Sequence, residues 1–262
     1  MQRGRAIWTT CPAPDPEARC RLFCLPYAGA GASIFRGWPA ALRGVAELWP
    51  VHLPGRERRL SDRAPDTVVA LAGEVARGLA ACLDRPFVLF GHSMGGLLSF
   101  EVARQLRRLD LPLPRALLVS GYGGPHLPDT RPRIHALPDA AFLEAIGALD
   151  GTPEDVLANT ELMALLLSLL RADFRMVETY RFQPGVPLDM PIHVYGGRDD
   201  KDAPRKALEA WSAQTTGPAT VTLFEGGHFY LKDEAAALLS RLRRDILALA
   251  AAPEPAGSRL RG

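Results

Sequence analysis

Cysteine is scarce in this sequence of 262 residues, and long apolar runs are missing. The four cysteines, Cys11, Cys20, Cys24 and Cys82, show neither C-x-x-C spacing nor a matching pair of histidines, which argues against a zinc site or a disulfide framework. No apolar run approaches the roughly 20 residues that a membrane span needs. Residues 1–8 lack the apolar core of a signal peptide. We therefore expect a cytoplasmic protein with reduced thiols, no metal site and no membrane partner.

Net charge is also low, because 31 lysines and arginines nearly balance 29 acidic residues, for a formal charge of +2. A nucleic-acid-binding protein usually carries a large basic surface, so we expect no nucleic-acid partner. The apolar share of 47% and charged share of 23% are those of an ordinary globular protein with a sizeable core. The length fits one large α/β domain or two small ones, and no internal repeat divides the chain.

The most informative stretch is residues 87–98, which read FVLFGHSMGGLL. An apolar run ends at a glycine, a serine follows within two residues, and a second apolar run begins after further glycines. The pattern G-x-S-x-G between a strand and a helix is the nucleophile elbow, which presents a serine hydroxyl at the end of a sheet. The free N–H groups of the helix N-terminus would point at whatever Ser93 attacks.

Apolar segments separated by helical patterns predict a mostly parallel sheet covered by helices on both faces. Asp66 and Thr67 are expected to cap a helix through Leu83, and a final helix should run from Asp233 to about Ala250. Pro50 should put its strand at an edge or bulge of the sheet. Besides the strand of the elbow, strands are expected at residues 21–25, 47–53, 116–120, 192–195 and 219–224.

The alternation of strand and helix stops between residues 123 and 187. A helix should begin at Asp139, residues 151–153 should break it, and Asn159 should cap another helix from Glu161 to Leu170. That second helix is apolar almost all round, so it is either a core helix or a lid over an apolar pocket. Its place between two strands favours a lid. We expect a core formed by residues 1–122 and 188–252, with an N-terminal arm (1–20), a helical lid insertion (123–187) and a flexible tail (253–262).

An alcohol is a weak nucleophile at neutral pH, so Ser93 requires a base, and the base requires an orienting acid. His228 follows the last strand in a glycine-flanked loop, which suits a base. The other histidines lack this setting, except that His92 lies in the elbow and should point away from the substrate. The chain order serine, acid, histidine is that of α/β-hydrolases.

The acid is ambiguous from the sequence. In the turn G-x-x-D, counting from Gly197 selects Asp200, whereas counting from Gly196 selects Asp199. We prefer Asp200 and keep Asp199 as the alternative.

Attack on an acyl carbonyl produces an oxyanion, which two backbone N–H groups should stabilise. One should belong to Met94, the residue after the nucleophile. The other should come from the loop after the first strand, with Ala28 preferred and Tyr27 as the second choice.

Several blocks of sequence occur in a specific order: LPYAGAG (25–31), LPGRE (53–57), GHSMGG (91–96) and GGHFY (226–230), with LPD (137–139), GTP (151–153) and LRADF (170–174) in the lid. Together they make the chain resemble a type II thioesterase, a discrete editing enzyme of polyketide and non-ribosomal peptide synthesis and a member of the α/β-hydrolase superfamily. The resemblance covers roughly residues 22–238. Proline is common in that family where this chain has Ser168 and Lys201, which affects the lid helix and the turn of the acid.

The resemblance implies a serine hydrolase that cleaves acyl thioesters from the phosphopantetheine arm of acyl or peptidyl carrier proteins, without a cofactor of its own and as a monomer. Such a partner is acidic, so four arginines could help to dock it. A solvated turn, offset by Glu57 and Asp62, is the alternative for them. The competing functions are an esterase or lipase, an acyltransferase or cyclising release enzyme, and a catalytically silent binding module. The arginines in question are Arg56, Arg58, Arg59 and Arg63.

Overall fold

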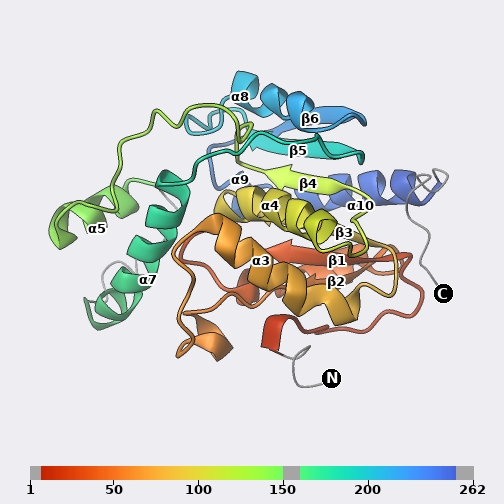
Figure 1. Cartoon of the computed structure of the whole chain (residues 1–262), viewed down its shortest axis with the longest axis horizontal. Helices are drawn as coiled ribbons and strands as arrows, with labels where there is room; N and C mark the ends of the chain where they lie inside the picture. The colour runs from red at the N-terminus through yellow and green to blue at the C-terminus, as the bar shows by residue number, and fades with distance from the viewer. Residues whose placement is uncertain (1–6, 150–159, 252–262) are drawn as a thin grey trace.

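The computed structural model describes residues 7–149 and 160–251 and contains one six-stranded sheet (Figure 1). The strand order is β2-β1-β3-β4-β5-β6, and every neighbouring pair is parallel. The carboxyl ends of the strands therefore lie at the same edge of the sheet. The strands are β1 (Cys20–Leu25), β2 (Ala46–Pro50), β3 (Phe87–His92), β4 (Leu117–Ser120), β5 (Ile192–Gly197) and β6 (Ala219–Phe224).

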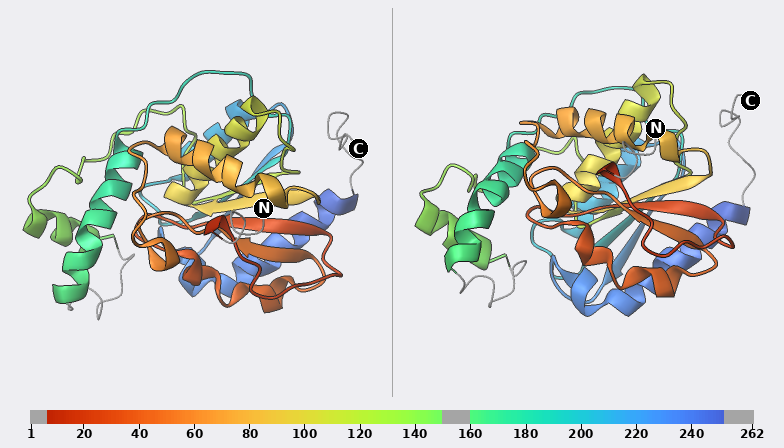
Figure 2. Two further views of the ribbon diagram at one scale, coloured as in Figure 1. Left: turned by 60° about the horizontal axis from the view of Figure 1, so that its bottom comes forward. Right: turned by 90° about the horizontal axis from the view of Figure 1, so that it is seen from below.

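Successive strand residues face opposite sides of the sheet and feed two apolar clusters. Phe23 and Leu25 pack with residues of α3 (Val68–Leu79), α4 (Met94–Arg108) and α8 (Arg205–Glu209). Leu22 and Cys24 pack instead with α2 (Trp38–Leu42), α9 (Tyr230–Asp233) and α10 (Ala235–Ala251). Figure 2 shows these helices on the two sides of the sheet. The expected α/β-hydrolase class, a parallel sheet covered on both faces, is confirmed. Short 3-10 turns complete the layers: η1 (Ala32–Phe35), η2 (Glu57–Arg59), η3 (Ala80–Cys82) and η4 (Ala210–Gln214).

The edge position predicted from Pro50 is confirmed, because β2 pairs with β1 alone among the described strands. The strand is shorter than expected and ends at Pro50 rather than at residue 53. Beyond it, Val51 forms a single antiparallel bridge with Thr9 of the N-terminal arm. The arm is more firmly packed than a surface arm would be, since Thr9 is buried and the ring of Trp8 lies beneath the guanidinium of Arg59.

Between β4 and β5 the chain forms α5 (Asp139–Gly147) and α7 (Thr160–Glu178), which lie beside the carboxyl edge of the sheet (Figure 1). The start of α5 at Asp139 agrees with the prediction. Helix α7 runs eight residues beyond Leu170, because apolar side chains continue at helical spacing through Phe174 and Val177. The expected break at 151–153 and the cap at Asn159 lie outside the described residues. Within the described ranges, no helix combines the length and the apolar character that crossing a bilayer requires.

Candidate active site

Ser93 lies between β3 and α4 with a backbone conformation of φ 54° and ψ −119°, which a non-glycine residue seldom adopts. Its N–H donates to the carbonyl of Ser120 at 2.7 Å, and this bond ties the turn to β4. A Cβ atom on Gly91 would lie 1.9 Å from the carbonyl oxygen of Gly95. One on Gly95 would lie 2.2 Å from that of Leu25. Both glycines of the motif are therefore required by backbone-to-backbone contact.

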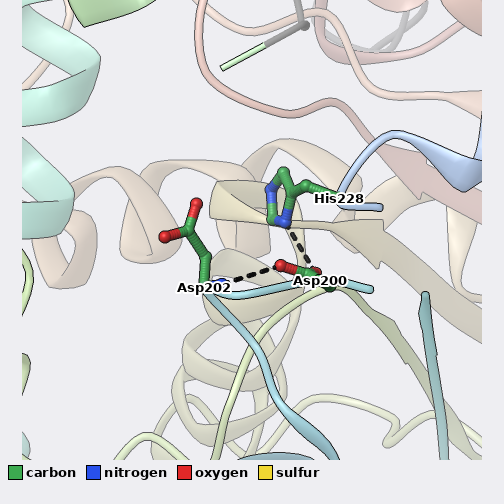
Figure 3. Close-up of side chains that lie close together, drawn as sticks. All are labelled: Asp200, Asp202 and His228. Carbon is green, nitrogen blue, oxygen red and sulfur yellow. Dashed lines mark hydrogen bonds and ion pairs between the residues drawn. The ribbon is translucent and has the colours of Figure 1, made fainter. Parts of the chain in front are cut away.

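Ser93, His228 and Asp200 form one series of hydrogen bonds. The Oγ atom of Ser93 lies 3.0 Å from Nε2 of His228, and Nδ1 of His228 lies 2.8 Å from Oδ2 of Asp200 (Figure 3 shows the second contact). Since an ionised carboxylate only accepts, Nδ1 donates to Asp200 and Nε2 is left to accept from the serine hydroxyl. The Asp200 side chain is 1% exposed, whereas Ser93 and His228 are partly exposed. The arrangement is that of a base held for proton transfer.

Asp200, and not Asp199, lies against His228. The second carboxylate oxygen of Asp200, Oδ1, accepts from the N–H groups of Asp202 at 2.9 Å and Ala203 at 3.1 Å, so the carboxylate is fixed at both oxygens. Asp199 is exposed, and its own N–H donates to the carbonyl of Gly226. The N–H groups of the turn, and not the spacing of the G-x-x-D motif, therefore decide between Asp200 and Asp199.

Asp202 brings a second carboxylate to the same place (Figure 3). Ligand atoms of Asp200, Asp202 and His228 lie within 4.8 Å of one another, a spacing that would suit a metal ion. Both oxygens of Asp200 and the Nδ1 atom of His228 are already engaged in hydrogen bonds with each other and with the turn. The imidazole of His228 uses both nitrogens in hydrogen bonds, to Asp200 and to Ser93, so it could bind a metal only by breaking one of these bonds.

The loop after β1 packs against the elbow, because the place of a Gly95 Cβ is occupied by the carbonyls of Leu25 and Pro26. Ala28 contacts the apolar cluster that contains Met94. Among the described residues, the N–H groups of Ala28, Tyr27 and Met94 donate none of the loop, turn and cap hydrogen bonds. Met94 and both candidates in the loop after β1 thus keep a backbone donor available on the two segments that meet beside Ser93.

His92 lies beneath His228, with ring centroids 5.0 Å apart, and is fully buried. Its Nδ1 atom contacts Oγ of Ser120 at 2.8 Å, and that hydroxyl contacts the Tyr230 hydroxyl at 2.6 Å. Burial, together with the nearby charges of His228 and Lys232, lowers the pKa of His92 well below its ordinary value. His92 is therefore a neutral support for the ring above it. The sequence motifs assign no role at the site to Ser120 or Tyr230, although Ser120 stands out as the polar end of an otherwise apolar strand.

The four arginines of the basic turn differ in burial. Arg56 is buried against Asp173 of α7, and Arg59 is buried against Asp62 and Trp8. Arg58 and Arg63 are exposed. The docking hypothesis is therefore wrong for Arg56 and Arg59, whose guanidinium groups are used inside the protein. The offset by Asp62 is confirmed for Arg59, whereas Glu57 accepts backbone N–H groups of η1.

Comparison with known proteins agrees with this geometry. A family model described as a thioesterase domain matches residues 20–246. Linear gramicidin dehydrogenase LgrE of Brevibacillus parabrevis is 39% identical over 236 residues, which span 89% of this chain and 90% of that protein. Gramicidin S biosynthesis protein GrsT of Aneurinibacillus migulanus is 38% identical over 224 residues, which span 86% and 88%. The solved structure of the type II thioesterase BorB, from the borrelidin biosynthetic cluster, has a TM-score of 0.83 at 36% identity, covering 92% of this chain and 98% of that one.

Proposed function

Because the chain belongs to the thioesterase family, we propose that it is a type II thioesterase. In this role it hydrolyses acyl thioesters held on the phosphopantetheine arm of acyl or peptidyl carrier proteins, and so frees carriers blocked by stalled or aberrant acyl groups. The observation that carries the proposal is the hydrogen-bonded series of Ser93, His228 and Asp200 in a chain of this family. The naming of BorB as a type II thioesterase of a biosynthetic cluster supports the class of partner.

In the proposed mechanism, Oγ of Ser93 attacks the thioester carbonyl carbon while Nε2 of His228 takes the hydroxyl proton. Asp200 holds the imidazole in the tautomer that allows this and stabilises the imidazolium. The N–H groups of Met94 and Ala28, with Tyr27 as the second choice for the latter, bind the oxyanion. His228 then returns the proton to the departing thiolate, and a water molecule, activated by the same imidazole, releases the acid from Ser93.

A thiolate is a good leaving group, so this chemistry needs no cofactor beyond the pantetheine that the partner carries. The dehydrogenase activity in the name of LgrE is not carried over to this chain. The loop after β1 has Gly29 and Gly31, but Ile34 stands where a G-x-G-x-x-G dinucleotide fingerprint has its third glycine. We further propose that residues 123–187 form a lid over the acyl chain, since Leu169 and Leu170 of α7 lie against Gly55 and Gly29.

The test is hydrolysis of a panel of acyl carrier proteins by the wild-type chain and by Ser93→Ala. Free acid and free carrier thiol should accumulate with the wild type and not with the variant, while Ser61→Ala, which alters an exposed serine, should match the wild type. A fluorophosphonate should label Ser93 in the wild type. Faster cleavage of a matched oxygen ester would favour an esterase, an ester or macrocyclic product would favour an acyltransferase, and no labelling would favour a silent binding module.

A further inference from the structure

A buried ion pair joins α7 to the loops at the carboxyl edge of the sheet. The guanidinium of Arg56 donates to both carboxylate oxygens of Asp173, from Nη1 at 2.8 Å and from Nη2 at 2.9 Å. The two side chains are 4% and 0% exposed. A buried pair of charges is costly to desolvate and is retained only where its remaining hydrogen-bonding groups are also satisfied. The partners of those remaining groups therefore show what the pair does.

Two of those partners belong to the loop after β1, and the third is the carbonyl of Pro54, two residues before Arg56, which accepts from Nε at 3.2 Å. Oδ2 of Asp173 also accepts the N–H of Gly29 at 2.8 Å, and Nη1 of Arg56 also donates to the carbonyl of Ala30 at 3.1 Å. Gly29 has a φ of +75°, and Leu170 of α7 occupies the place where its Cβ would be. Helix α7 therefore contacts Gly29 in two ways: Asp173 accepts its N–H, and Leu170 packs against its Cα.

These contacts lie one peptide group away from the proposed oxyanion donor, the N–H of Ala28. The N–H of Ala30 donates to the carbonyl of Tyr27 at 3.0 Å and closes a turn that has Gly29 at the position where positive φ is needed. The Tyr27 carbonyl and the Ala28 N–H belong to the same peptide plane. Anything that holds Gly29 and Ala30 therefore also sets the direction of the Ala28 N–H.

The far end of the loop is held in a similar way. The Glu57 carboxylate accepts the N–H groups of Ala32 at 3.0 Å and Ser33 at 2.9 Å. Burial acts to raise the pKa of Glu57, but its hydrogen bonds with Ser33 and Ala32 outweigh burial and lower it. Residues 29–33 are therefore fixed by a carboxylate at each end, of which only Asp173 belongs to the segment between β4 and β5.

We propose that Asp173 and Arg56 are positioning residues that hold the Ala28 N–H in the oxyanion hole, so that the seating of α7 determines the catalytic competence of Ser93. The inference rests on the proposed function for its choice of substrate. It assigns Arg56 of the basic turn a role in catalysis in place of carrier docking. It also makes the lid helix a part of the active site.

The main test is Asp173→Asn, assayed on a small soluble acyl thioester that needs no carrier protein. We expect kcat to fall about tenfold, a fraction of the 10²–10³ that loss of a whole oxyanion donor costs, with KM changed less than twofold. The matched control is Asp66→Asn. Like Asp173, Arg175 belongs to α7, and it pairs with Asp66. The Asp66 side chain is largely exposed, so kcat of Asp66→Asn should stay at the wild-type value.

A second variant separates positioning from stability. Arg56→Met combined with Asp173→Leu replaces the ion pair by apolar side chains, a change that often leaves stability intact. We expect a Tm close to wild type together with a kcat at least as low as that of Asp173→Asn. Recovery of kcat along with Tm, or a wild-type kcat in Asp173→Asn, would overturn the proposal.

Failure of the proposed function would be recognised separately, because the wild type would then fail to hydrolyse any thioester. The rate at which a fluorophosphonate labels Ser93 depends on the same oxyanion donors and needs no natural substrate. Slower labelling of Asp173→Asn than of Asp66→Asn supports the positioning role in either case, and equal labelling rates contradict it.

Discussion

Helix α4 begins directly after Ser93 and buries twelve of its fifteen residues, whereas the described side chains of α7, those of residues 166–178, include few buried apolar ones. Among residues 166–178 of α7, Leu169, Leu170 and Met176 are the buried apolar side chains, and two further buried residues, Asp173 and Glu178, are charged. The nucleophile is therefore held by close packing, and the proposed oxyanion loop by a few polar links. The first region should respond to changes in volume, and the second to changes in charge.

The largest effect of all is expected from Asp200→Asn, a change of charge at the acid that holds His228, outside both of these regions. The amide preserves the shape, but its NH₂ group can face Nδ1 of His228 and favour the wrong tautomer, so kcat should fall about 10⁴-fold. Asp199→Asn alters the exposed neighbour and should leave kcat within a factor of two. Steady-state hydrolysis of one small thioester by both variants measures the ratio. Equal losses in the two would remove Asp200 from its proposed role.

Gly95→Ala tests directly whether packing fixes the elbow. The new methyl group would meet the carbonyls of Leu25 and Pro26 at 2.2 and 2.8 Å, and backbone cannot move aside cheaply. We expect unfolding free energy to drop by about 1–3 kcal/mol. Activity should fall about 10²–10³-fold, as when an oxyanion donor is displaced. Gly37→Ala is the control, since nothing lies within 4 Å of its Cβ position. Urea unfolding and thioester hydrolysis together would show whether α4 tolerates the added volume.

Acid should weaken the packed region through His92. Its folded pKa is well below that of the unfolded chain, so below about pH 6.5 the unfolded state binds a proton that the folded state does not, and stability falls as pH falls. The slope from this one group approaches about 1.4 kcal/mol per pH unit. His92→Asn can keep a hydrogen bond to Ser120 and should flatten urea-measured stability between pH 6.5 and 5. Part of the slope will remain in His92→Asn, because burial also lowers the pKa of His52 and His193.

The same division explains what the sequence could predict. The elbow, the sheet and the place of His228 follow from local patterns, because strand, turn and helix are adjacent in the chain. The choice between Asp200 and Asp199 depends on which carboxylate the amides of the turn can reach, which the motif does not encode. The pairing of Arg56 with Asp173 joins residues 117 positions apart and leaves no local pattern. The basic turn therefore looked like a surface feature, although half of its arginines are buried.

The smallest effect on catalysis is expected from the exposed arginines of the basic turn. Arg58 and Arg63 are exposed, so in the double variant Arg58→Glu/Arg63→Glu the fold and the turnover of a small thioester should be unchanged. If these arginines attract an acidic carrier protein, KM for acyl carrier protein should rise severalfold at low salt, and the difference should shrink as added salt screens exposed charges.

The matched comparison is Arg56→Lys, which alters the buried arginine of the same loop. It should lower kcat on the small thioester, because an ammonium cannot reproduce the two-pronged contact with Asp173. A rise in KM for the carrier protein in Arg56→Lys, with kcat unchanged, would mean that the buried and exposed arginines act together in docking, and the distinction between them would fail.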